Sequence, residues 1–387
     1  MKKSLIALAA LSAIAGAAQA QSSVEVYGLL DTGYHIYEST GVGAKQQVTS
    51  VGGLNSSNGT GALNGTRLGF RGTEDLGGGN KAMFLMEYGV NLTAKEDQAA
   101  LADNVTGQGL GNLRTGWVGL SNAKLGTVQV GTLYSFVDPT SGSLGATQAH
   151  TGTNNPAPTG AAALLKYGQN ARSANTIQYT SPSYMGLTAK LGVQQSETIS
   201  GSAPKANQSN MYAIDYAAGN LKAGYVYQVI NSVTNASAKL VDVLGSANDT
   251  SLTTGTGLAT LTYNVFGGTY DFGFAKLGLN HSDYKNEEVV GGAVKVKSNQ
   301  NSFSASVPVT AAITLGGAYT DGKIEQAGVK QYGTTGYDLN VVYSLSKRTN
   351  VYAMYEESKF DNKVGSGLQT GASIKSTHYG VGVRHSF

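Results

Sequence analysis

The feature that most constrains this chain is an alternation of apolar and polar side chains that recurs along its length. Segment 337–345 sets Tyr, Leu, Val, Tyr and Leu against Asp, Asn, Val and Ser. Segments 211–216, 221–229 and 260–265 repeat the rhythm, with no helical stretch between the repeats. A period of two residues is that of a β-strand whose two faces differ, so the alternation predicts an all-β protein.

The chemistry of the two faces separates a soluble sandwich from a membrane barrel. Both would alternate, because each sheet of a sandwich also packs one face inward. Here one face carries Ser, Thr, Asn, Gly and charges, while Tyr and aliphatic residues occupy the other. This distribution favours a barrel with a polar lumen and an apolar outer wall. On the segment 260–265 we expect the lipid-facing side chains to be Leu261, Tyr263 and Val265.

The connections between the alternating segments differ in length. Seven short ones and eight long ones require sixteen strands, with both termini at the short-turn end. Bacterial barrels place short turns in the periplasm and long loops outside. The sequence therefore predicts a 16-stranded antiparallel transmembrane β-barrel with short periplasmic turns and long extracellular loops. The short turns are expected at 75–79, 122–126, 182–186, 218–220, 271–274, 308–311 and 346–349, and the long loops at 39–63, 93–111, 135–172, 196–207, 231–257, 286–298, 322–333 and 359–374.

The first twenty residues have the features of an export signal. Lys2 and Lys3 precede an apolar stretch, and small residues end it at Ala20, so we expect cleavage before Gln21. The mature part, 21–387, shows no linker and is expected to form one barrel domain. It keeps 25 of the 27 basic residues against 24 acidic ones, a balance too neutral for a nucleic-acid partner. After the signal, no apolar run is long enough for a membrane-spanning helix.

Motifs for bond chemistry are absent from the sequence. The run Gly77–Lys81 (GGGNK) lacks the ending of a phosphate-binding loop and is interpreted as a turn. The chain has no Cys, and its five His show no metal-ligand spacing, with His378 and His385 expected on opposite faces of one strand. We therefore predict no catalytic residues, no cofactor and no metal. No nucleophile motif supports an outer-membrane hydrolase.

Several segments together resemble the trimeric Gram-negative porins, especially their β-proteobacterial branch. They are Val26–Gly33 (VYGLLDTG), Thr66–Gly79 (TRLGFRGTEDLGGG), Trp117–Leu120 (WVGL) and Val381–Phe387 (VGVRHSF). The resemblance spans essentially all of 21–387. It implies a general diffusion porin in the Gram-negative outer membrane: a homotrimer in which each subunit has its own pore, narrowed by a third loop folded into the lumen. It also implies contact with outer-membrane lipid and lipopolysaccharide, and recognition of Phe387 by the assembly machinery.

In such a channel, charges on the lumen wall set selectivity. Alternation places Leu68 and Phe70 toward lipid, which turns Arg67 and Arg71 inward. In the same way, we expect the next strand to present Lys81 and Glu87 to the lumen, and the strand after it to place Trp117 on lipid and Arg114 inside. By resemblance, Arg172 joins the inner wall, and Arg67 and Arg114 belong to a basic ladder facing the third loop.

The third loop departs from the family pattern. Between 135 and 171 the chain has a single acid, Asp138, which is the acidic residue we place nearest the constriction, and it lacks the family's Pro-Glu-Phe-Gly-Gly element. The chain also has Gly-Thr-Leu at 131–133, where many relatives carry Gly-Arg-Gln. Few acids facing several arginines predict a weak preference for anions. Two other functions stay open: a substrate-specific channel, for which Tyr284 and Tyr352 could line a sugar path, and an adhesin that uses the long loops.

Overall fold

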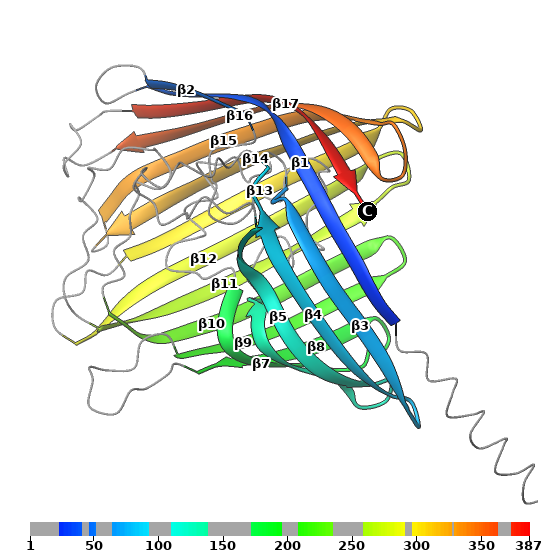
Figure 1. The fold of residues 1–387 in the computed structure, drawn as a ribbon. Coiled ribbons are helices and arrows are strands. Elements are labelled where there is room, and N and C mark those ends of the chain that lie inside the picture. Colours follow the sequence, from blue (N-terminus) through cyan, green and yellow to red (C-terminus); the bar gives the residue numbers. More distant parts are fainter. Residues whose placement is uncertain are drawn as a thin grey trace, which may run out of the picture.

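The computed structural model describes residues 23–40, 46–51, 64–92, 110–137, 172–195, 208–234, 258–290, 296–326, 329–362 and 373–387. They form one antiparallel sheet of seventeen strands (Figure 1). The strands are β1 (Ser23–Thr40), β2 (Gln46–Val51), β3 (Arg67–Gly77), β4 (Asn80–Val90), β5 (Leu110–Asn122), β6 (Gly126–Tyr134), β7 (Arg172–Thr180), β8 (Leu187–Gln194), β9 (Gln208–Ala218), β10 (Leu221–Thr234), β11 (Leu258–Asp271), β12 (Lys276–Val290), β13 (Val296–Pro308), β14 (Ile313–Gln326), β15 (Val329–Ser344), β16 (Thr349–Asn362) and β17 (Ser373–Ser386).

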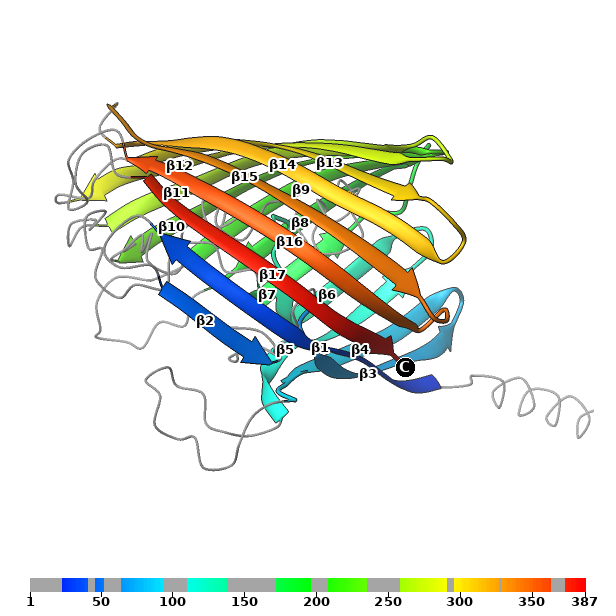
Figure 2. The same ribbon diagram turned by 90° about the horizontal axis from the view of Figure 1, so that it is seen from above.

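The sheet closes on itself, because β1 has a partner on each edge. One edge pairs with β17, from Leu29 opposite Ser386 to Thr40 opposite Lys375. The other edge pairs with β3 along its first half and with the short strand β2 along its second half. Since β2 lies inside the first long connection, the barrel wall consists of the other sixteen strands, which confirms the predicted number (Figure 2).

All seven predicted short turns are present at the end that holds both described termini. The first, between β3 and β4, has Gly77, Gly78 and Gly79 at φ of 80°, 60° and 80°, a left-handed conformation that glycine adopts at little cost. Two of the predicted long loops are wrong in extent. Strands β12 and β13 continue through most of 286–298, and β14 and β15 through most of 322–333, because polar outer-face residues such as Lys323 and Glu325 still pair within the sheet.

The two faces of the wall differ in the predicted sense on most strands. On β15, Leu339 and Val341 are exposed on the outer face, whereas Asp338 and Asn340 are buried on the inner face. The outer faces of β9 and β10 likewise expose Ile214 and the residue opposite it, Tyr225. In the described part of the chain, no helix is long and apolar enough to span a membrane.

Strand β11 reverses this rule. Val265 lies opposite Val226 of β10 on the inner face, so the prediction that Leu261, Tyr263 and Val265 meet lipid is wrong. All three are at most 3% exposed, and the outer face of β11 carries Phe266 instead. The physical reason is that this part of the inner wall is shielded from water, so apolar side chains are stable there.

Candidate charged site on the lumen wall

Glu87 on β4 is the centre of a cluster of charged and phenolic side chains on the inner wall. Its Oε1 accepts a hydrogen bond from Nε of Arg114 at 2.8 Å and lies 3.7 Å from Nη1 of Arg67. The hydroxyls of Tyr27 and Tyr134 donate to its two oxygens at 3.0 and 3.3 Å. Because Glu87 is only 5% exposed, this carboxylate requires such a full set of donors.

The glycine of the Arg-Leu-Gly-Phe motif makes room for one of these donors. Tyr27 on β1 faces Gly69 on β3, and a Cβ atom on Gly69 would lie 2.2 Å from the Tyr27 ring carbon Cζ. The ring therefore lies across Gly69, and this brings its hydroxyl to Glu87 on the next strand. Here the motif residue is needed for close packing rather than for chemistry.

A second network fixes the beginning of β3, and with it Arg67. Asp31 of β1 is fully buried and accepts hydrogen bonds from the backbone N–H of Asn64 at 2.8 Å and from the hydroxyl of Tyr352 at 2.6 Å. The Thr66 hydroxyl donates to the Asp31 carbonyl at 2.9 Å and accepts from the Asp31 N–H at 3.0 Å. These bonds hold the residue before Arg67 against the wall.

A β-bulge in β5 places Arg114 in the cluster and corrects one prediction. Opposite Leu85 and Glu87 of β4 lie Trp117 and Thr115, so Trp117 is on the inner face and not on lipid. The register then shifts, because Tyr88 faces Leu113. The extra residue is Arg114, which points inward beside Thr115. The prediction assumed uniform alternation and put Trp117 on the wrong face. Because the bulge changes the phase, the inward side predicted for Arg114 is nevertheless correct.

After β6 the chain turns toward the opposite wall. Ser135 Oγ donates to the Gln228 side-chain oxygen on β10 at 2.8 Å, and the Gln228 amide donates to Ser209 Oγ on β9 at 2.9 Å. Phe136 and Val137 follow, each 4% exposed. The described start of the third long connection is therefore bound to the inner face of β9 and β10. Residues 138–171, including Asp138, lie outside the described residues.

The remaining predicted residues lie at different distances from the Glu87 cluster along the strands. Arg172 begins β7, and its guanidinium carbon is 5.9 Å from the centre of the Tyr134 ring, beside the Glu87 cluster. Arg71 forms a two-point pair with Glu25 at 2.8 and 2.9 Å, about 14 Å along β3 from Arg67. Lys81 adjoins the short turn, about 20 Å along β4 from Glu87. Phe387 lies on the outer face over Gly28, with backbone hydrogen bonds of 3.1 Å in both directions.

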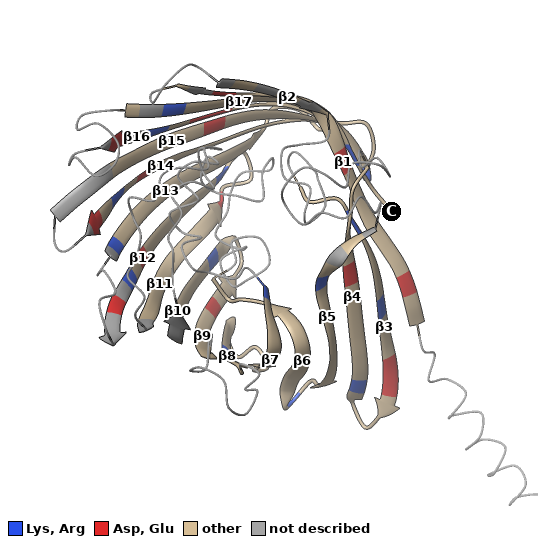
Figure 3. Cartoon of the chain, turned by 60° about the vertical axis from the view of Figure 1, so that its left-hand side comes forward, with Lys and Arg blue, Asp and Glu red and all other residues tan. Residues whose placement is uncertain are grey.

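The cluster carries a net positive charge. Among its described members, Arg67, Arg114 and Arg172 contribute three positive charges and Glu87 one negative charge, so their sum is +2. Figure 3 shows basic and acidic positions on the neighbouring strands β3, β4 and β5. Fixed guanidinium groups on one wall attract anions and orient dipolar solutes. Within the described residues, no group of three or more His, Asp or Glu side chains is arranged to hold a metal ion. The arrangement can select among ions, but it has no nucleophile placed beside a base.

Sequence reasoning missed the two tyrosines of the cluster. Tyr27 follows Val26, which is exposed on the outer face, so alternation alone gives Tyr27 an inward direction. Its contact with Glu87 was not, because the two residues come from strands on either side of β3. The possible sugar-path residues Tyr284 and Tyr352 do lie on the inner face, but they are 2% and 4% exposed. Neither offers an open aromatic surface to a solute.

A family model and two relatives from comparison with known proteins indicate the same family. A model described as Gram-negative porin matches residues 7–363. Outer membrane porin protein 32 of Delftia acidovorans is 32% identical over 412 residues, and an outer membrane porin protein of Bordetella pertussis is 28% identical over 424; both alignments cover all of each chain.

Solved structures give the same fold. An anion-selective porin from Comamonas acidovorans superposes with a TM-score of 0.64 at 22% identity, and covers 95% of this chain and 100% of that one. The Vibrio cholerae outer membrane protein OmpT gives a TM-score of 0.63 at 14% identity, over 95% and 98% of the two chains.

Proposed function

This chain belongs to the Gram-negative porin family and is a diffusion channel of the outer membrane, and we propose that its selectivity is set by the inner-wall cluster around Glu87. Family and fold are those of a channel rather than an enzyme. The pore passes ions and small hydrophilic solutes without bond chemistry. The observation that supports the proposed site is the convergence of Arg67 and Arg114 on the Glu87 carboxylate, with Arg172 beside the Tyr134 ring that also contacts Glu87.

The proposed selectivity is a weak preference for anions. Arg114 is tied to Glu87 by a short bond, whereas Arg67 stands 3.7 Å away with its side chain 19% exposed. Arg67 therefore keeps part of its charge available to a passing ion. The solved porin from Comamonas acidovorans is described as anion-selective, and the same preference is proposed for this chain from its own charges.

The test is a measurement of reversal potential. The purified wild-type protein is inserted in a planar bilayer under a KCl gradient. The proposal predicts a potential of the sign given by chloride passing faster than potassium. A potential of the opposite sign contradicts the anion preference, and no conductance at all contradicts the channel function.

We propose further that the third long connection narrows the lumen. Its described start supports this, because Ser135 is hydrogen-bonded to Gln228 and Gln178 donates to the Tyr134 carbonyl at 2.7 Å. The chain is thus drawn inward at the level of the Glu87 cluster. Asp138, one residue beyond Val137, is proposed as the acid closest to the arginines.

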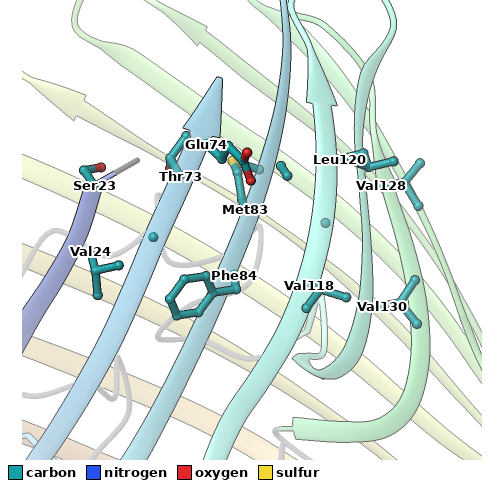
Figure 4. A pocket seen from close by; sticks show the side chains of 13 residues that line it. Ser23, Val24, Thr73, Glu74, Met83, Phe84, Val118, Leu120, Val128 and Val130 are labelled. Carbon is teal, nitrogen blue, oxygen red and sulfur yellow. The ribbon is translucent and has the colours of Figure 1, made fainter. Parts of the chain in front are cut away.

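We propose that the chain forms a homotrimer and that the outer face of β1 and β3 to β6 is the interface between its subunits. On β1 and β3 to β6 the outer face contains a groove of about 530 Å³ with a mainly apolar lining (Figure 4). An apolar groove of this kind can receive apolar side chains of a sister subunit. The groove is lined mainly by Val24, Phe84, Val118, Leu120, Val128 and Val130.

A charge in the groove tests this interface. Val118→Arg is expected to give folded monomers, because a guanidinium in a tightly packed interface has no partner. Leu279→Arg on β12 is the matched control, since both side chains are more than half exposed on the outer face. Chemical cross-linking of the detergent-solubilised proteins measures whether each variant is a monomer or a trimer. Trimers in both variants, or monomers in both, contradict the proposed location.

The remaining proposals concern the two ends of the chain and the surrounding membrane. Residues 1–20 are proposed to be a cleaved export signal, and they lie outside the described residues. Phe387 is proposed to be read by the outer-membrane assembly machinery, supported by its exposed position (43%) at the end of β17. The apolar outer wall is proposed to contact lipid, and its polar margin lipopolysaccharide.

A further inference from the structure

The seam between β1 and β17 holds two buried histidines that the proposed ion pathway does not use. His35 and His378 are 343 positions apart in the chain, yet Nδ1 of His35 lies 3.0 Å from Nε2 of His378. The other ring nitrogen of His378 lies 3.0 Å from Oε2 of Glu356 on β16. His35 is 0% exposed, and His378 and Glu356 are each 6% exposed. The three side chains form one continuous hydrogen-bonded line across three strands.

The wall is shaped to hold the His35 ring. A Cβ atom on Gly380 would lie 2.2 Å from His35 Nδ1, and a Cβ atom on Gly33 would lie 2.7 Å from His35 Nε2. The imidazole therefore occupies space that two glycines leave empty. Tyr37 stacks on His378 with ring centres 4.0 Å apart and planes 11° apart. Neither imidazole can turn away without displacing these neighbours.

The geometry fixes where protons can reside. A Glu356 carboxylate accepts the Nδ1–H of His378, so Nε2 of His378 accepts the Nδ1–H of His35. Nε2 of His35 is then unprotonated, and it has no hydrogen-bond partner among the described residues. A further proton produces either two N–H groups facing each other at 3.0 Å or a buried N–H without an acceptor. Both arrangements cost free energy.

The carboxylate that contacts the pair lies on the His378 side. Asp338 of β15 lies directly opposite Glu356 on the inner face, and Asp31 of β1 is bound by Tyr352 at 2.6 Å. Among the described residues, Tyr37 is the other titratable group with a ring contact to the pair. Two carboxylates therefore lie on the Glu356 side of the line, while glycine backbone surrounds His35. A further proton on His35 would therefore give an N–H group that has no carboxylate in hydrogen-bond contact among the described residues.

We propose that His35 and His378 form an acid-sensitive clasp that holds β1 to β17 at neutral pH and weakens when the pair takes up a further proton. Histidine changes its charge in roughly the range pH 5 to 8, which an outer-membrane protein meets in its surroundings. The stabilisation is present where the rings are neutral, and it is lost as pH falls through this range. The inference depends on the closed fold and not on the proposed selectivity.

The test measures the unfolding temperature of the barrel at two pH values. The full-length purified protein, folded in detergent, is heated at about pH 7.5 and at about pH 5.5, an interval in which ordinary carboxylates stay charged. The wild type is expected to unfold roughly 3 °C or more lower at the acidic pH. His35→Gln and His378→Gln are each expected to unfold earlier than wild type at pH 7.5, and to show little change between the two conditions.

His385→Gln is the matched control. This histidine lies on the same strand but on the outer face, 2.9 Å from Thr349 Oγ1, so its variant should keep the wild-type pH response. Equal unfolding temperatures for the wild type at the two pH values overturn the proposal. So does a full acid response in either seam variant, because a purely structural role leaves that response in place.

A second measurement uses the wild type alone, so it tests the proposal even if the histidine variants do not fold. After correction for intrinsic rates, amide hydrogen exchange in 29–40 and 375–386 should be faster at about pH 5.5 than at about pH 7.5. The pair β13 and β14 serves as the internal reference, because its inner face has no histidine. If the exchange rates of β1 and β17 relative to those of β13 and β14 are the same at both pH values, the proposed clasp is contradicted.

Discussion

The lumen wall of β3 to β5 and that of β9 to β12 have the same backbone construction and opposite chemistry. The first carries Arg67, Glu87 and Arg114 in one bonded cluster. The second carries Met211 and Leu261, both fully shielded from solvent, together with other apolar side chains. The difference shows that the inner face of a barrel is not one environment. One side has a cluster of fixed charges, and the other has apolar side chains around Gln228, to which the start of the third connection is bound.

Charge reversal should show that one wall controls selectivity. Replacing Arg67 and Arg114 together with Glu is expected to change the sign of the reversal potential toward cations, the largest effect we predict, because it inverts the field at the cluster. Lys81→Glu with Lys222→Glu makes the same net change of charge next to short turns. Reversal potentials under a KCl gradient compare the two proteins. An equal shift in both would mean that the cluster is not the narrow part.

Truncation of a ring on the opposite wall should act on stability. Tyr263→Ala removes a ring that is 1% exposed and 5.0 Å from the ring of Tyr284, and it is expected to lower the free energy of unfolding by about 3 kcal/mol. Phe266→Ala, on the outer face and 53% exposed, should cost less. Denaturant titrations from lipid vesicles give both values. A larger cost at Phe266 would contradict the inner position of Tyr263.

The smallest predicted effect concerns the contact between the third connection and the wall. Gln228→Leu removes the bonds to Ser135 and Ser209, so closures of the single channel should become about fivefold more frequent, from the loss of about 1 kcal/mol. Gln300→Leu is the control: it is also buried on the inner wall, and its amide has no hydrogen-bond partner within the described ranges. Bilayer recordings with similar closure rates in the two variants would exclude the anchoring role.

Alternation predicted the strands and most of their faces, because a closed wall between lipid and a polar lumen sorts side chains residue by residue. It failed at β11, where Leu261 and Tyr263 are buried inside, since the pattern reports polarity and not which side is apolar. It failed at Trp117, since a bulge changes the phase without a sequence mark. The approach of His35 to His378 depends on closure between β1 and β17 and could not be predicted locally.

The resemblance to porins singled out arginines of the inner wall, but it did not predict how they are held. Arg67, Arg114 and Arg172 were singled out, and the structure brings them to one place. Arg71 and Lys81 were grouped with them, yet they lie farther along their strands toward the short turns. Their height depends on register, which alternation does not specify. The role of Glu87 as the common acceptor required the three-dimensional arrangement.

The most direct test of the account places single cysteines on neighbouring residues of β3 in a chain that has none of its own. Arg67→Cys faces the cluster and Leu68→Cys faces outward. A negatively charged thiol reagent added during bilayer recording is expected to lower the current through Arg67→Cys stepwise, and to leave the current through Leu68→Cys unchanged. An unaltered current through the Arg67 variant, or an equal block in both, would contradict the central claim that this arginine lines the narrow part of the pore.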